Sequence, residues 1–137
     1  MVFQTRVEVP TDGRGLYHIT EIVNGALKGD LPETGLLNIF VQHTSASLVI
    51  QENADQTAQA DLEEFIERIV PRDQDWHRHT TEGPDDTTSH MKSSITATSL
   101  YVPIHQNKLA LGSWQGIYLW EHRDQPHIRN LMLTVVS

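Results

Sequence analysis

Apolar and polar side chains alternate along several stretches of the chain, which is the pattern of half-buried β-strands. Residues 2–9 alternate in this way, and residues 36–43 place Leu37, Ile39 and Val41 on one face. Further strands are expected at residues 47–52, 100–103, 109–111, 115–123 and 128–136. Strands are therefore expected to outnumber helices.

Helical spacing is clearest at residues 53–70, where one apolar stripe faces a row of acidic residues. The stripe consists of Ala58, Leu62, Phe65, Ile66 and Ile69. Asn53 and Gln56 have the form of a capping box at its start, and Pro71 marks its end. This segment is predicted to be the longest helix.

Two further helices are predicted. Apolar residues recur at helical spacing from Ile19 to Ala26, and Gly29 stands where a C-cap glycine is expected. Residues 86–96 form the other helix, after a polar and irregular segment at residues 72–85. With 137 residues and no internal repeat, the chain is expected to be a single domain over residues 1–137.

Composition excludes several classes of function. No apolar run approaches the roughly eighteen residues of a membrane span, and the charged N-terminus does not resemble a signal peptide, so we expect a cytoplasmic protein without membrane contact. The chain has no cysteine, so any metal must be held by His, Asp, Glu or water. A net charge of −8 without a basic cluster argues against nucleic acid as a partner.

Polar residues fall on the apolar faces of three predicted strands, where burial must be compensated. His43 follows Val41 on one face, Glu52 ends a second strand, and Glu121 and Arg123 share a face of a third. Each could be an exposed strand end, with Glu121 and Arg123 paired as i, i+2 neighbours. Three such ends together favour the interpretation that His43, Glu52, Glu121 and Arg123 are catalytic.

A metal site is indicated by Asp86 and His90, which lie four residues apart on one face of a predicted helix. The alternative is an acidic helix N-terminus with a surface histidine. His79 and Glu82 precede them on a short loop and favour the metal, so His43, His79, His90 and Asp86 are the expected ligands. This set suits Zn²⁺, or Mg²⁺ where oxygen ligands predominate. Neutral imidazole is the ligand form, so occupancy is expected to fall below about pH 6.

Lys92 and Arg123 are the cations expected to meet an anionic substrate, and both are predicted to lie outside the core. Trp114 and Gln115 offer a flat wall and an amide for a heteroaromatic ring, although Trp114 could equally pack in the core. Thr44, Ser45 and Ser47 lack the surroundings of a nucleophile elbow, so a serine hydrolase is rejected. The other histidines are expected at the surface or at interfaces: His18, His77, His105, His122 and His127.

Three blocks of sequence resemble one family: HTSASLVIQENADQ at 43–56, DDTTSHMKSS at 85–94 and LGSWQGIYLWEHR at 111–123. With His79 and Glu82-Gly83, they are similar to the YjbQ-like family, also called the secondary thiamine-phosphate synthase family. The resemblance implies an α+β fold with an antiparallel, sandwich-like β core and two to three helices. It also implies a homotrimer with a polar, histidine-containing pocket near the subunit boundary.

The family's motif residues carry over to His43, Thr44, Ser45, Glu52, Asn53, Asp55, Asp61, His79, Glu82, Gly83, Asp86, His90, Lys92, Trp114, Gln115, Glu121 and Arg123. Among these we expect Thr44, Ser45, Asn53, Trp114 and Gln115 to bind substrate, and Lys92 to join the catalytic set. Gln51 and Ser113 depart from the usual Asn and Thr but keep hydrogen-bonding groups.

The activity implied by the resemblance joins hydroxymethylpyrimidine diphosphate to thiazole phosphate and releases pyrophosphate. Such a transfer requires a divalent metal and cations to stabilise the departing polyanion. Two other functions use the same residues. One is a metal- or small-anion-binding protein without turnover, and the other is metal-assisted hydrolysis, in which water is the nucleophile.

Overall fold

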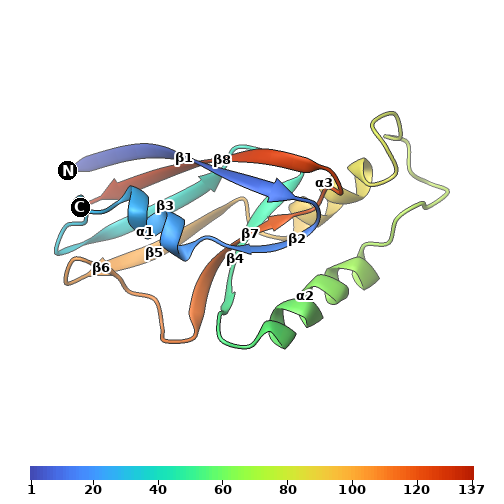
Figure 1. The fold of residues 1–137 in the computed structure, drawn as a ribbon. Coiled ribbons are helices and arrows are strands. Elements are labelled where there is room, and N and C mark those ends of the chain that lie inside the picture. Colours follow the sequence, from blue (N-terminus) through green and yellow to red (C-terminus); the bar gives the residue numbers. More distant parts are fainter.

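The computed structural model describes all 137 residues. The strands are β1 (Val2–Asp12), β2 (Gly15–His18), β3 (Thr34–Val41), β4 (Ala46–Glu52), β5 (Ser99–His105), β6 (Lys108–Leu109), β7 (Gln115–Glu121) and β8 (Pro126–Val136). The helices are α1 (Thr20–Ala26), α2 (Gln56–Ile69) and α3 (Asp86–Ile95). Figure 1 shows α2 and α3 at the end of the molecule away from both termini.

All strand pairs are antiparallel and form two sheets. One sheet has five strands in the order β1-β8-β3-β5-β6, and the other has three in the order β2-β7-β4. Both sheets and α1 contribute to a single apolar core, for example through Leu37, Leu119 and Val23. The expected α+β class with an antiparallel β core is confirmed. No helix has the length and apolar character needed to cross a membrane.

The pairing of β4 with β7 determines where the motif residues lie. Ala46 pairs with Glu121 at one end of this ladder, and Glu52 pairs with Gln115 at the other. Six residue steps separate the two ends, which amounts to roughly 20 Å at about 3.3 Å per residue. Motif residues that precede β7 are therefore far from those that follow it within one chain.

The helix α2 lies over the small sheet and buries less of its apolar stripe than the sequence suggests. Ile66 packs with Val70 and Trp120 in a small second core. Phe65 remains 55% exposed and Ile69 49% exposed. The stripe is therefore only partly covered within one chain.

Several predicted boundaries were wrong by a few residues. The N-cap of α2 is Asp55, whose carboxylate accepts the amide of Thr57 at 2.9 Å, so the Asn53 capping box does not form. The C-cap of α1 is Leu27 and not Gly29. Strands β3 and β7 end two residues before the predicted ends, which leaves His43 and Arg123 in the connections that follow.

Candidate functional site

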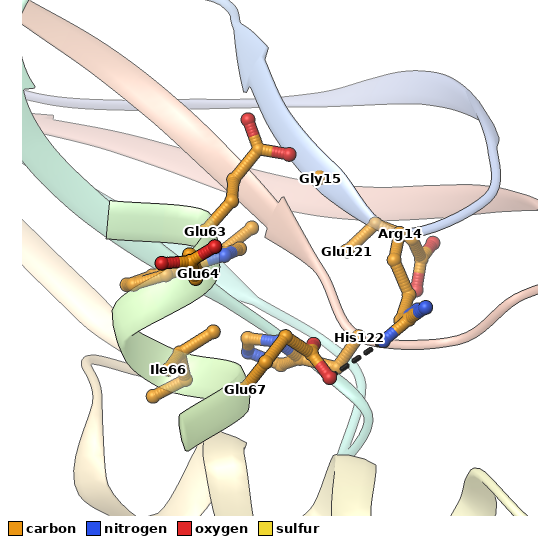
Figure 2. A pocket seen from close by; sticks show the side chains of 9 residues that line it. Arg14, Gly15, Glu63, Glu64, Ile66, Glu67, Glu121 and His122 are labelled. Atoms are coloured by element: carbon orange, nitrogen blue, oxygen red, sulfur yellow. Dashed lines mark ion pairs between the residues drawn. The ribbon is translucent and has the colours of Figure 1, made fainter. Parts of the chain in front are cut away.

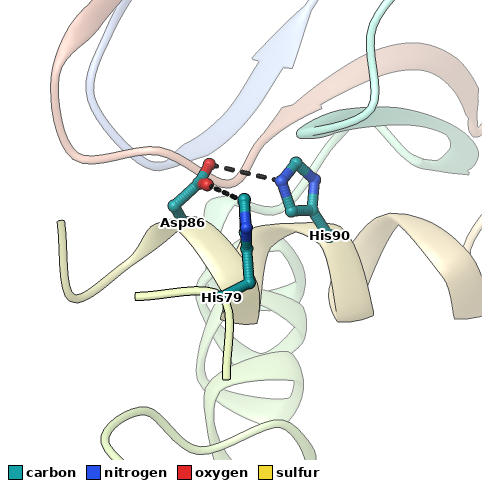
Figure 3. A group of neighbouring side chains, drawn as sticks. All are labelled: His79, Asp86 and His90. Atoms are coloured by element: carbon teal, nitrogen blue, oxygen red, sulfur yellow. Dashed lines mark ion pairs between the residues drawn. The ribbon is translucent and has the colours of Figure 1, made fainter. Parts of the chain in front are cut away.

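Three of the four expected metal ligands converge at the start of α3. One ligand atom from each of His79, Asp86 and His90 lies within 4.8 Å of the others. The Nε2 atom of His79 is 2.6 Å from Oδ2 of Asp86, and Nε2 of His90 is 3.4 Å from Oδ1. Figure 3 shows His79 reaching the carboxylate from the loop before the helix, while His90 reaches it from one turn along α3. The short loop therefore folds back as the sequence indicates.

The surroundings of Asp86 and His90 orient them for ligation. The Asp86 side chain is 2% exposed, and its Oδ2 atom contacts Nε2 of His79, which is itself a candidate ligand. The other ring nitrogen of His90, Nδ1, lies 3.0 Å from the carbonyl oxygen of Thr44. A proton on Nδ1 for this contact leaves Nε2, which faces the carboxylate, to bind a metal when the ring is neutral, as in a metal-binding histidine.

Arg123, which follows the end of β7, forms hydrogen bonds with this site. Its guanidinium donates to Asp85 at 3.0 Å, to Asp86 Oδ1 at 2.8 Å and to the carbonyl oxygen of Glu82 at 3.0 Å. Burial opposes ionisation of Asp86, but the charges of His90 and Arg123 outweigh it, and the pKa of Asp86 is lowered. Arg123 is thus fully engaged with the loop and the helix start.

Lys92 is buried, so the prediction that it lies outside the core was wrong. Its ammonium group pairs with Glu67 of α2, and Arg14 binds the same carboxylate at 2.6 Å. Burial lowers the pKa of Lys92, while the charge of Glu67 acts in the opposite direction. The lysine therefore ties α3 to α2.

Glu121 pairs with Arg129 of β8, and the side-chain pair with Arg123 that was the alternative interpretation does not form. Arg129 Nε donates to Glu121 Oε1 at 2.7 Å, and Thr11 Oγ1 donates to the same oxygen at 2.6 Å. Arg123 contacts Glu121 through its backbone amide alone, which donates to Oε2 at 3.1 Å. Oε2 also accepts a hydrogen bond from Arg129. Burial alone would raise the pKa of Glu121. The hydrogen bonds from Arg129 and Thr11 lower it by more, so the net shift of the pKa is downward.

Arg129 was missed in the sequence, although a signal is present. It occupies an inward position of β8, in the same alternation as the buried Leu131, Leu133 and Val135. A charged residue in register with an apolar strand face requires a buried partner. That reasoning was applied to Glu121 and would have found Arg129 too.

His43, Thr44 and Ser45 lie in the connection from β3 to β4, beside the buried ion pair. His43 Nε2 accepts the backbone amide of Asn130 at 2.8 Å, and His43 is not in the ligand cluster. Burial and the charge of Arg129 lower the pKa of His43. Ser45 Oγ accepts from Arg129 at 2.9 Å.

The remaining motif residues lie at the other end of β4 and β7. Asn53 donates to the carbonyl oxygen of Gln115 at 3.3 Å, and the Gln115 amide oxygen accepts the amide of Gly112 at 2.7 Å. Trp114 is 67% exposed, so it does not pack in the core. Glu52 is exposed at the end of its strand. The structure therefore separates the predicted site residues into two groups.

His122 is a buried residue, so its placement at the surface was wrong. It continues the alternation of the buried Tyr118 and Trp120, and its Nε2 lies 2.9 Å from Ser47 Oγ. Burial, with the charges of Lys92 and Arg129, lowers its pKa to about 3. It lines a cavity of about 230 Å³ together with Glu63, Glu64 and Glu67. Figure 2 shows His122 beside α2.

The fold and this site define a small α+β protein with a histidine–carboxylate cluster at the start of its third helix. The family described as UPF0047 protein YjbQ-like matches residues 5–137, and the chain belongs to this family. It is 43% identical to a UPF0047 protein from Synechocystis over 93% of this chain and 86% of the relative. It is 40% identical to UPF0047 protein YjbQ of Escherichia coli O157:H7 over 98% of both chains.

Solved structures agree with this assignment. A conserved hypothetical protein from Thermus thermophilus superposes with a TM-score of 0.83 at 37% identity, over 94% of this chain and 97% of that chain. A hypothetical protein from Aeropyrum pernix gives a TM-score of 0.88 at 26% identity, over 98% of both chains. These relatives are named for their family or source and not for an activity.

Proposed function

We propose that the chain binds a divalent metal ion through His79, Asp86 and His90, and that the bound ion acts on a small phosphorylated molecule. The observation that carries this proposal is the convergence of three ligand atoms within 4.8 Å. The burial of the Asp86 carboxylate supports it, since its Oδ2 atom contacts His79 and a metal ion can take the place of that contact.

The donor set favours Zn²⁺ over Mg²⁺. Two imidazoles and one carboxylate are typical of catalytic zinc sites, in which a water or substrate takes the fourth position. Mg²⁺ prefers a shell of oxygen ligands. The side chains of His79 and His90 are 51% and 36% exposed, so a ligand from solvent has access to the metal. Zinc at such a site activates water or polarises a phosphoryl oxygen.

Metal titration of purified, untagged protein is the direct test. About one Zn²⁺ per chain is expected by elemental analysis after dialysis, with a loss of at least about tenfold in affinity for His90→Ala. His105→Ala is the matched control, because His105 is exposed on β5, outside the cluster. Equal zinc affinity in the wild type and His90→Ala would refute the site.

The specific reaction implied by the family resemblance is the joining of hydroxymethylpyrimidine diphosphate to thiazole phosphate. Lys92 is paired with Glu67, and Arg123 with Asp85 and Asp86. Since both cations are already neutralised, a bound metal, Mg²⁺ or Zn²⁺, is proposed to supply charge that stabilises the leaving pyrophosphate. Thiamine phosphate formation is therefore expected to require metal and to be lost in His90→Ala.

The same assay separates the three functions. Product that is indifferent to metal and to His90→Ala would place the transfer elsewhere. Release of inorganic phosphate or pyrophosphate without thiamine phosphate identifies metal-assisted hydrolysis. Metal binding without any turnover identifies a binding protein.

A homotrimer is the assembly we propose. The outer face of the five-stranded sheet carries exposed apolar residues, among them Phe40, Tyr101 and Val136, and an apolar sheet face of this kind favours association. Light scattering coupled to size exclusion is expected to give three times the chain mass. A monomer at micromolar concentration would contradict this assembly.

A further inference from the structure

Most of the Lys and Arg side chains form ion pairs within the chain. Six of the ten form salt bridges with carboxylates: Arg14, Arg68, Arg72, Lys92, Arg123 and Arg129. The four without such a partner are Arg6, Lys28, Arg78 and Lys108. Of these four, Arg78 alone lines a hollow together with a member of the metal cluster.

That hollow is an open groove of about 420 Å³ between the loop before α3 and the helix itself. Its walls are Trp76, His77, Arg78, His79, Thr87 and Met91. His79 belongs to both the groove and the metal cluster, so a molecule in the groove lies against the proposed metal site. Figure 1 shows this loop running from α2 to α3 along the edge of the molecule.

An apolar hollow adjoins the groove. A second hollow of about 300 Å³ shares Trp76 and Met91 with the first and is lined further by Ile69, Pro71 and Ile95. Trp76 is 65% exposed, and its ring meets that of His77 edge-on at 4.5 Å. An exposed indole beside apolar walls binds a flat ring well, because stacking and burial both contribute.

The two hollows differ in character. Arg78 and His79 give the groove a polar end beside the metal cluster, whereas Ile69 and Ile95 line the apolar end.

We propose that this groove binds a single phosphoryl group carrying a flat aromatic body, with the phosphoryl group at Arg78 and the metal, and the ring on Trp76. The inference rests on the proposed metal site, and it names the substrate class of that site. Arg78 has a planar guanidinium that binds phosphate through two parallel hydrogen bonds. One free guanidinium and one metal ion match one phosphoryl group.

The probe for this groove is 1-naphthylmethylphosphonate, whose P–C bond is not hydrolysed, with methylphosphonate as the matched ligand without a ring. Calorimetry on the zinc-loaded protein measures both. Arg78→Ala is expected to weaken both ligands by about tenfold or more, since it removes a charge-assisted hydrogen bond. Trp76→Ala is expected to weaken the naphthyl ligand by about threefold to tenfold and to leave methylphosphonate unchanged.

The control variants are Lys108→Ala, which removes an unpaired cation on β6, and Phe65→Ala, which removes an exposed aromatic ring on α2 outside the groove. Both are expected to bind like the wild type. Wild-type binding by Arg78→Ala and Trp76→Ala, or an equal loss in the controls, would overturn the inference. Zinc content is measured for every variant. Normal zinc content with no ligand binding refutes the groove alone, whereas zinc affinity that is unchanged in His90→Ala refutes the metal site.

Discussion

Acidification is expected to destabilise the fold through His122, which the native structure holds neutral. The side chain is 2% exposed, its Nε2 lies 2.9 Å from Ser47 Oγ, and the charges of Lys92 and Arg129 are close enough to act on it. Burial and these charges lower the pKa of His122 to about 3. The unfolded chain has an ordinary histidine with a pKa of about 6.5.

The sign follows from which state takes up the proton. Below pH 6.5 the unfolded chain binds a proton at residue 122 and the native chain does not, so the free energy of unfolding falls as pH falls. At pH 5 the native His122, with a pKa of about 3, is still neutral. The loss there relative to pH 7 is about 2 kcal/mol, because 1.5 pH units at about 1.4 kcal/mol each separate pH 5 from the unfolded pKa. The loss continues down to about pH 3.

Urea unfolding at pH 7, 6 and 5, in the presence of a chelator, measures this loss for the wild type and for His122→Asn. The variant does not titrate at this position, so it should lose about 2 kcal/mol less than the wild type between pH 7 and pH 5. His43 also has a lowered pKa, but it contributes equally to both proteins and cancels. His105→Asn is the exposed control and should behave like the wild type. Equal losses in the wild type and His122→Asn would refute the reasoning.

Three further substitutions test the packing and the site. Glu121→Gln leaves a buried arginine uncompensated and is expected to cost about 3–5 kcal/mol of stability in urea unfolding; a loss below about 1 kcal/mol would contradict this. Arg123→Ala removes the hydrogen bonds that hold the loop before α3 and should weaken zinc binding by about tenfold or more. Unchanged zinc affinity in a titration would show that Arg123 does not position the ligands. Gly35→Ala places a Cβ 2.6 Å from the carbonyl oxygen of Val136 and should cost about 1–3 kcal/mol, whereas Gly25→Ala, with open space around it, should not destabilise.

Local spacing predicted most of the elements and the convergence of His79, Asp86 and His90, because both depend on short stretches of chain. Alternation in β3 identified Leu37, Ile39 and Val41 as core residues, and all three are buried. Asp86 and His90 are one helical turn apart, so their meeting needed only a correct helix. Local information was sufficient for these features.

Local spacing could not predict contacts between segments that are distant in the sequence. His43 Nε2 accepts the amide of Asn130, which is 87 residues away, and no local pattern indicates this bond. Arg123 was the only ion-pair partner that the sequence suggested for Glu121, as an alternative, but β7 ends at Glu121 and the chain turns there. Arg123 therefore reaches α3, while Arg129 returns on β8. Ion pairs of buried residues depend on the register of the sheets, which periodicity alone does not fix.

The length of β7 limits what one chain can do with its motif residues. Trp114 precedes this strand and Arg123 follows it, so roughly 20 Å of extended backbone separates them. A small molecule held at the metal cluster cannot stack on Trp114 of the same chain across that distance. Within one chain, the exposed indole that lines a hollow with His79 is Trp76. At the proposed metal site, ring recognition is therefore expected from the loop before α3, unless a second copy of the chain brings its Trp114 to the site.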